Sequence, residues 1–123
     1  MNVSSAAGKY GFAMRVPYAA AKWGVIGFTK SAAIELGPDG IRVNALLPGL
    51  VAGDRQRRVL EAKSQARSIS YKEMEALAFS YTSLKEFVTA GQLADLVVFV
   101  ASSRGRTISG QALSVAGDTN MLS

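Results

Sequence analysis

The chain has 123 residues, a net charge of +5, a hydrophobic fraction of 49%, and no cysteine or histidine. Its length is that of one domain, and its composition is ordinary for a globular protein. The missing residue types exclude disulfides, the usual zinc sites and nucleophiles activated by histidine. Proton transfer must therefore use tyrosine, lysine, a carboxylate, or a relay through serine and water.

The predicted elements begin with strand, helix and strand. Residues 1–5 end a short buried strand, and a glycine-containing loop leads to a helix over 17–36 that stops at Gly37. This helix is apolar over most of its surface, which predicts burial on more than one face. After a glycine-proline turn, residues 41–49 form a second buried strand.

The rest of the chain starts with a segment of different character. Residues 54–89 are polar and patchily helical with no strong apolar face, which indicates a mobile excursion rather than core. A second helix over 91–103 and a final buried strand over 111–117 follow. Because strands and helices alternate, we predict an α/β fold with a parallel sheet.

Three segments are expected at one edge of this sheet. In open α/β sheets, ligands bind at the carboxyl ends of the strands. The first strand ends at Ser5, the second ends before residues 48–51, and the helix begins beside Tyr18. We therefore expect these segments to converge on one site.

Tyr18 and Lys22 lie one helical turn apart on the same face. An ammonium near a phenol favours the phenolate, which makes the tyrosine usable as an acid or base nearer neutral pH. Ser5 precedes Tyr18 by thirteen residues and can hydrogen-bond the oxygen that gains or loses the proton. Taken alone, a tyrosine–lysine pair at this spacing is most often a surface contact.

Ser5, Tyr18 and Lys22, followed by the stretches IRVNALLPG and ISGQALSVAG, resemble the short-chain dehydrogenase/reductase family over nearly the whole chain. The resemblance implies a partial Rossmann-like fold. It also implies hydride transfer between the nicotinamide of NAD or NADP and a carbonyl or alcohol carbon of a small molecule. Tyr18 would exchange a proton with the substrate oxygen, which Ser5 would position. Lys22 would support Tyr18 and bond the nicotinamide ribose, so both would also contact the cofactor.

The same resemblance assigns further positions on the cofactor side. Pro48, Gly49 and Val51 match the segment that passes the nicotinamide, with the Val51 backbone near the carboxamide. The family often has threonine where this chain has Gly53, so no side-chain contact is expected there. Asn44 would be structural, and no metal is implied.

Members of the family are about twice as long as this chain. The resemblance therefore implies that 1–123 is the C-terminal part of a Rossmann domain, with 54–89 as the substrate lid and the N-terminal dinucleotide-binding half absent. The chain contains no GxxxGxG or GxGxxG motif. The family's sheet order would leave the first strand as an exposed edge, which predicts partial folding or a compensating homo-oligomer. In the family, the Tyr18 helix and the last helix and strand usually form such interfaces.

Two other functions remain open on the residues alone. The absent phosphate-binding loop favours a non-catalytic remnant or interaction subunit that binds no cofactor. The positive charge is compatible with a nucleic-acid module, but basic and aromatic residues do not interleave, so we expect no nucleic-acid partner. A basic cluster is either a solvated helix face or a site for a phosphate or thioester-carrier substrate; it consists of Arg55, Arg57, Arg58, Lys63 and Arg67.

We expect a cytoplasmic protein with no membrane partner. No apolar run in the sequence is long enough to span a bilayer. The first residues lack the basic region and apolar core of a signal peptide.

Overall fold

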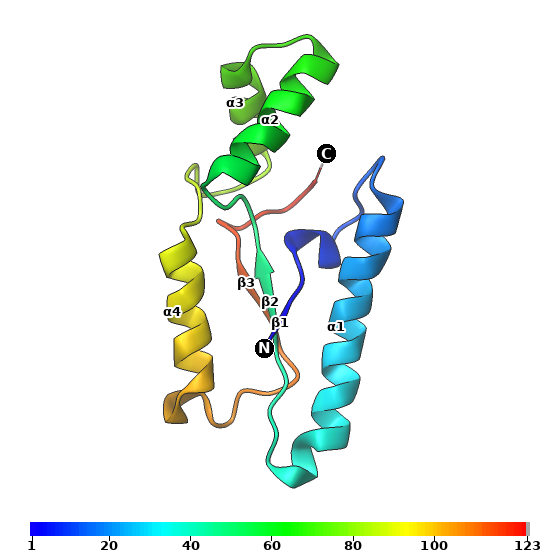
Figure 1. Cartoon of the computed structure of the whole chain (residues 1–123), viewed down its shortest axis with the longest axis vertical. Coiled ribbons are helices and arrows are strands. Elements are labelled where there is room, and N and C mark those ends of the chain that lie inside the picture. The colour runs from blue at the N-terminus through cyan, green and yellow to red at the C-terminus, as the bar shows by residue number, and fades with distance from the viewer. Residues whose placement is uncertain (123) are drawn as a thin grey trace.

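The computed structural model describes residues 1–122 as an α/β fold (Figure 1). The predicted order of strand, helix, strand, intervening segment, helix and strand is confirmed. No helix in this part of the chain is long and apolar enough to cross a membrane. The elements are β1 (Asn2–Val3), the short helix η1 (Ala6–Gly8), α1 (Val16–Leu36), the short helix η2 (Gly37–Asp39), β2 (Ala45–Pro48), α2 (Asp54–Arg67), α3 (Tyr71–Ser80), α4 (Ala90–Ala101), the short helix η3 (Ser103–Gly105) and β3 (Ala112–Val115).

The three strands form one parallel sheet in the order β1-β2-β3. Ala45 of β2 lies opposite Asn2 on one side and Ala112 on the other. β1 is an edge strand, as expected, and Val3 on it is 57% exposed.

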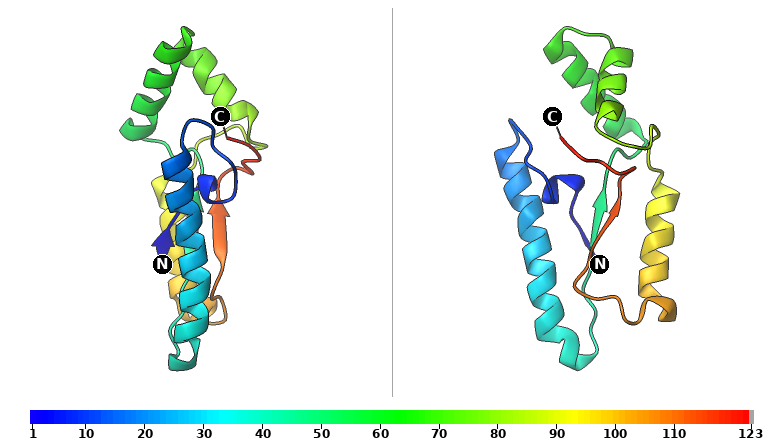
Figure 2. Two further views of the ribbon diagram at one scale, coloured as in Figure 1. Left: turned by 90° about the vertical axis from the view of Figure 1, so that its right-hand side faces the viewer. Right: turned by 180° about the vertical axis from the view of Figure 1, so that it is seen from behind.

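Helices cover both faces of the sheet. α1 lies against one face and α4 against the other, and the views from front and back agree (Figures 1 and 2). α2 and α3 stand beyond the carboxyl ends of the strands (Figure 2). Residues 45–47 of β2 are buried and form the centre of the core. The open space for a ligand is therefore at the carboxyl edge, beneath α2 and α3.

Side chains just before β2 tie the sheet to α4. The buried Asn44 amide donates to the Ile108 carbonyl at 2.8 Å and accepts from the Gln111 amide at 3.0 Å. The Arg42 guanidinium donates to the carbonyl of Val100, near the end of α4, at 2.6 Å. These bonds satisfy backbone groups that would otherwise be buried without partners. Asn44 is thus structural, as expected.

The expectation that α1 is buried on more than one face is wrong. Only Thr29 and Ala32 of this helix are buried, whereas Phe28 is 64% and Ile34 is 80% exposed. In the described part of the chain, α1 packs with one side against the sheet and η1, and no layer covers its other side. Apolar composition therefore overstated how much of its surface is covered.

The end of α1 differs in detail from the prediction. The helix ends at Leu36 as predicted, but Gly37 keeps a right-handed conformation with φ −57° and begins η2. Gly40 is the left-handed residue, with φ 74°. Glycine tolerates this conformation without the strain of a Cβ.

The segment 54–89 is more ordered in secondary structure, and contributes more to the core, than the sequence suggested. α2 and α3 pack on each other, and Leu60 and Met74 are almost fully buried. α3 starts with a capping box, because Ser70 accepts from the Glu73 amide and Glu73 accepts from the Ser70 amide. The prediction that this segment contributes no core is therefore wrong.

The two later strands are shorter than predicted. Pairing is limited to Ala45–Pro48 in β2 and Ala112–Val115 in β3. β2 is buried because it lies between two strands and two helices. β3 is the far edge strand, so it is only partly buried, and Ser114 on it is exposed.

Candidate active site

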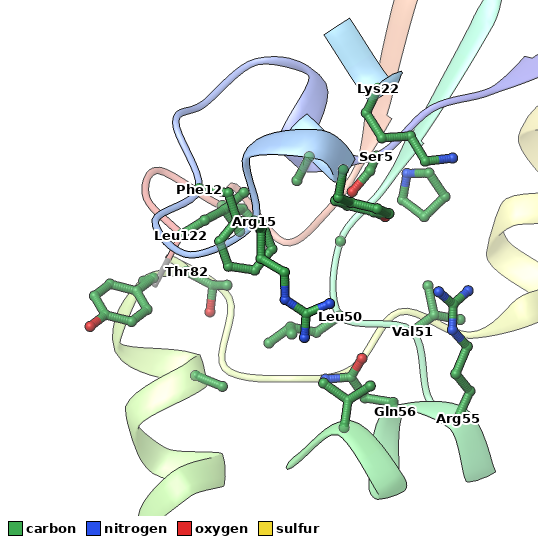
Figure 3. A pocket seen from close by; sticks show the side chains of 18 of the residues that line it. Ser5, Phe12, Arg15, Lys22, Leu50, Val51, Arg55, Gln56, Thr82 and Leu122 are labelled. Carbon is green, nitrogen blue, oxygen red and sulfur yellow. The ribbon is translucent and has the colours of Figure 1, made fainter. Parts of the chain in front are cut away.

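A cavity of about 550 Å³ lies at the carboxyl edge of the sheet (Figure 3). Its walls come from the end of β1, the start of α1, the β2–α2 connection, α2, α3 and the last described residues. The structure brings together all of the site residues predicted from the sequence, since each of them lines this cavity: Ser5, Tyr18, Lys22, Pro48, Gly49 and Val51.

Ser5 lies two residues after the end of β1 and caps η1. Its Oγ accepts a hydrogen bond from the Ala7 amide at 3.2 Å, so the hydroxyl proton remains able to donate to a ligand. The neighbouring Ser4 is buried, and its hydroxyl donates to the Lys22 carbonyl at 2.8 Å. Both serines line the cavity, but the Ser4 proton is already used within the protein.

Tyr18 and Lys22 stand in the first turns of α1. Pro17 lies at the start of this helix, where a missing amide hydrogen costs nothing. The Lys22 ammonium lies 5.7 Å from the centre of the Tyr18 ring and donates to the Val3 carbonyl at 3.2 Å. Phe12 packs edge-on against Tyr18, with ring centres 6.4 Å apart. The edge strand and the loop before α1 therefore hold the pair in place.

The segment after β2 is fixed by its backbone. The Gly49 amide donates to the Val115 carbonyl at 3.0 Å, and a Cβ on Gly49 would lie 2.7 Å from Cα of Ala116. Val51 forms a parallel bridge with Val88. That bridge uses the carbonyl of residue 50 and the amide of residue 52, and not those of Val51. At position 49 only glycine fits, because the chain there passes Ala116, the residue after β3, so closely.

One wall of the cavity is basic. Cζ of Arg15 lies 5.9 Å from the centre of the Phe12 ring, and Nζ of Lys63 lies 5.3 Å from the same point. Burial, and then the nearby charges of Arg15 and Arg67, lower the pKa of Lys63. Of the basic cluster predicted on α2, only Arg55 and Lys63 line the cavity, and the remaining members are exposed on the helix.

The last described residues form another part of the cavity wall. Thr119 forms an antiparallel bridge with Thr82, and the Asn120 amide donates to the Tyr81 carbonyl at 2.9 Å. This places Met121 and the neighbouring Leu122 in the wall.

Sequence reasoning missed several of these wall residues. Phe12 and Arg15 stand in a loop that follows a strand end, and that position was the available signal. Nothing in the sequence distinguishes Met121 and Leu122.

Comparison with known proteins identifies the chain. The family model described as enoyl-(acyl carrier protein) reductase matches residues 1–118. The chain belongs to the short-chain dehydrogenase/reductase family. An uncharacterized oxidoreductase of Bacillus subtilis, YxjF, is 38% identical over 118 residues, which are 95% of this chain and 46% of that protein. The chain spans about half the length of the curated relatives it matches. The resemblance seen in its motifs is thus confirmed.

Solved structures of this family share the fold. Actinorhodin polyketide ketoreductase with NADPH superposes with a TM-score of 0.87 at 33% identity, over 94% of this chain and 44% of that one. NAD⁺-bound xylitol dehydrogenase superposes with a TM-score of 0.86 at 25% identity, over 94% of this chain and 46% of that one. The three-stranded sheet and its helices are therefore part of a Rossmann-type architecture.

Proposed function

We propose that the chain supplies the acid/base and nicotinamide-facing parts of an NAD- or NADP-dependent oxidoreductase. Its substrate is a small molecule with a carbonyl or alcohol group. The observation that carries this proposal is the convergence of Ser5, Tyr18, Lys22 and the segment 48–51 on one cavity. Relatives of known structure that hold NADPH and NAD⁺ support either cofactor.

The residues around the cavity fit the proton transfer that this reaction needs. A bound nicotinamide supplies or accepts the hydride. In reduction, the Tyr18 phenol gives its proton to the substrate oxygen, and in oxidation the phenolate takes it back. The Lys22 ammonium, held near the ring by the Val3 carbonyl, stabilises the phenolate. The Ser5 hydroxyl, which already accepts from Ala7, donates to the same substrate oxygen and fixes its position.

In this proposal the backbone after β2 contacts the cofactor. Gly49 and the bridge between Val51 and Val88 hold this strand end rigidly against its neighbours. A rigid backbone segment suits a cofactor carboxamide, because no ordering of the chain is needed on binding. Pro48, at the end of β2, lines the same side of the cavity. In this proposal Lys22, on α1, bonds the nicotinamide ribose.

The test is removal of one hydroxyl group from Tyr18. Tyr18→Phe is expected to lower the rate of NADH- or NADPH-dependent carbonyl reduction by about 10²–10⁴-fold. The circular dichroism spectrum should be unchanged, and nicotinamide fluorescence should still show saturable cofactor binding. Tyr10→Phe is the matched control, because Tyr10 lies in the preceding loop and does not line the cavity. Full activity in Tyr18→Phe would reject the proposal.

A further inference from the structure

We propose that the substrate of this site carries an anionic group, a carboxylate or a phosphate, at the end of an apolar body, and that Arg15 and Lys63 bind that group. The inference deepens the proposed function and rests on it only in treating the cavity as the substrate site.

All charged side chains among the described residues that line the cavity are positive. Its cationic side chains come from the loop before α1, from α1 and from α2: Arg15, Lys22, Arg55 and Lys63. No aspartate or glutamate is among the described residues that line it. A concave site lined by charges of one sign concentrates ligands of the opposite sign.

Arg15 and Lys63 form a local cluster within this wall. They come from different elements, yet both lie within 6 Å of the Phe12 ring centre, at 5.9 and 5.3 Å. The ring attracts both cations, so it holds two like charges near each other. The pKa of Lys63 is lowered by burial and by Arg15. An anion bound here offsets this repulsion.

Arg15 of this cluster lies apart from Lys22 and Val51, two of the residues proposed to contact the cofactor, in the view of Figure 3. Figure 3 shows Arg15 reaching across the cavity toward Leu50 and Gln56, on the side of Phe12, while Lys22 and Val51 lie on the other side of the view. We therefore assign the anion expected at Arg15 to the substrate, and the titration with NADH described below tests the alternative of a cofactor phosphate.

The rest of this wall suits an apolar body. Apolar side chains from α2, α3 and the last described residues line the space around the cluster: Val59, Met74, Ala78 and Leu122. A cavity of about 550 Å³ accommodates a ligand of moderate size. The guanidinium of Arg15 offers a planar fork that binds a carboxylate or phosphate through two oxygens.

Isothermal titration calorimetry of the chain with hexanoate, hexyl phosphate and hexanamide tests the inference. Each probe contains six carbons in an unbranched chain, and the three head groups differ in charge. At least one anion is expected to bind about tenfold or more tightly than hexanamide, and the tighter of the two identifies the group. Equal affinity for all three probes would overturn the inference.

Variants locate the anion. The double variant Arg15→Gln/Lys63→Gln is expected to lose the preference for the anion over hexanamide. The matched control Arg58→Gln/Lys72→Gln removes one arginine and one lysine from exposed positions outside the cavity and should keep it. Equal loss in both variants would mean general charge attraction and would overturn the inference.

Two further measurements separate this inference from the proposed function. Hexanoate and hexanamide titrations repeated with saturating NADH should give the same preference. Displacement of hexanoate by NADH would assign the cluster to the cofactor and overturn the inference. Anion preference in a chain that binds no nicotinamide would sustain the anion site and reject the proposed function. Tyr18-dependent turnover without anion preference would do the reverse.

Discussion

The Ser4 hydroxyl donates a 2.8 Å hydrogen bond to the main-chain oxygen of Lys22. This bond joins the end of β1 to the second turn of α1, so Ser5 is held at a fixed place relative to Tyr18. Gly8 makes the close approach possible, because a Cβ there would lie 2.5 Å from Ser4 Oγ and 3.0 Å from the Lys22 carbonyl.

The first prediction concerns this contact. Gly8→Ala should lower the free energy of unfolding by about 1–3 kcal/mol, because the added methyl group has no space. It should also weaken nicotinamide binding, since η1 and α1 must move apart. Gly11→Ala is the control, because nothing lies within 4 Å of its Cβ position. Chemical denaturation measures the free energy of unfolding of the two variants. Equal stability of Gly8→Ala and Gly11→Ala would contradict the packing described here.

The second prediction uses the two capping boxes, one charged and one neutral. Glu73 accepts hydrogen bonds from the Ser70 side chain and backbone, and these lower its pKa. The stabilisation that the Glu73 carboxylate adds to the cap of α3 is therefore fully present above the ordinary glutamate pKa and is lost as the pH falls through the lowered value. In the capping box at the start of α4, the uncharged Gln92 side chain accepts the equivalent bond from the Thr89 amide.

Denaturation at neutral and acidic pH checks this contrast. Thr89→Ala should cost about 1 kcal/mol of unfolding free energy at both pH values. Glu73→Gln should lower stability at neutral pH and have much less effect in acid. The same cost for Glu73→Gln at both pH values would show that its charge contributes nothing to the cap.

The third prediction concerns the pH dependence of anion binding. Burial, Arg15 and Arg67 lower the pKa of Lys63, so this side chain loses its charge at a lower pH than an ordinary lysine. An anion binds the charged form, and hexanoate affinity should therefore fall as the pH rises through that lowered pKa. Lys63→Arg should keep the affinity to higher pH. A pH profile that is identical in Lys63→Arg would contradict this role.

The fourth prediction concerns the uncovered side of α1. Trp23 is 52%, Phe28 64% and Ile34 80% exposed, and the family resemblance implies that this helix meets a second copy. Sedimentation velocity should give a homo-oligomer, and Phe28→Lys should shift it toward monomer. Trp23 is the only tryptophan in the chain, so its emission should move to longer wavelength in the variant. A wild-type chain that is monomeric at high concentration would contradict this expectation.

Local geometry explains which parts of the site the sequence predicted. Tyr18 and Lys22 share a helix face at a spacing of four residues, and Pro48-Gly49 ends a strand, so each follows from nearby residues alone. The alternation of strands and helices predicted the parallel sheet for the same reason.

Long-range packing explains what the sequence did not predict. Phe12 and Lys63 are about fifty residues apart, and only the folded chain brings them together. The burial of Leu60 and Met74 arises because α2 and α3 pack on each other. A weakly patterned sequence does not reveal that pairing.

The most direct test of the account is a titration of the folded chain with NADH and with NADPH, followed by nicotinamide fluorescence. The account predicts saturable binding of at least one cofactor, weakened by Lys22→Met and unchanged by Tyr10→Phe. If a chain with a native circular dichroism spectrum binds neither, the cavity is not a nicotinamide site. The chain would then fit the alternative of a non-catalytic interaction subunit.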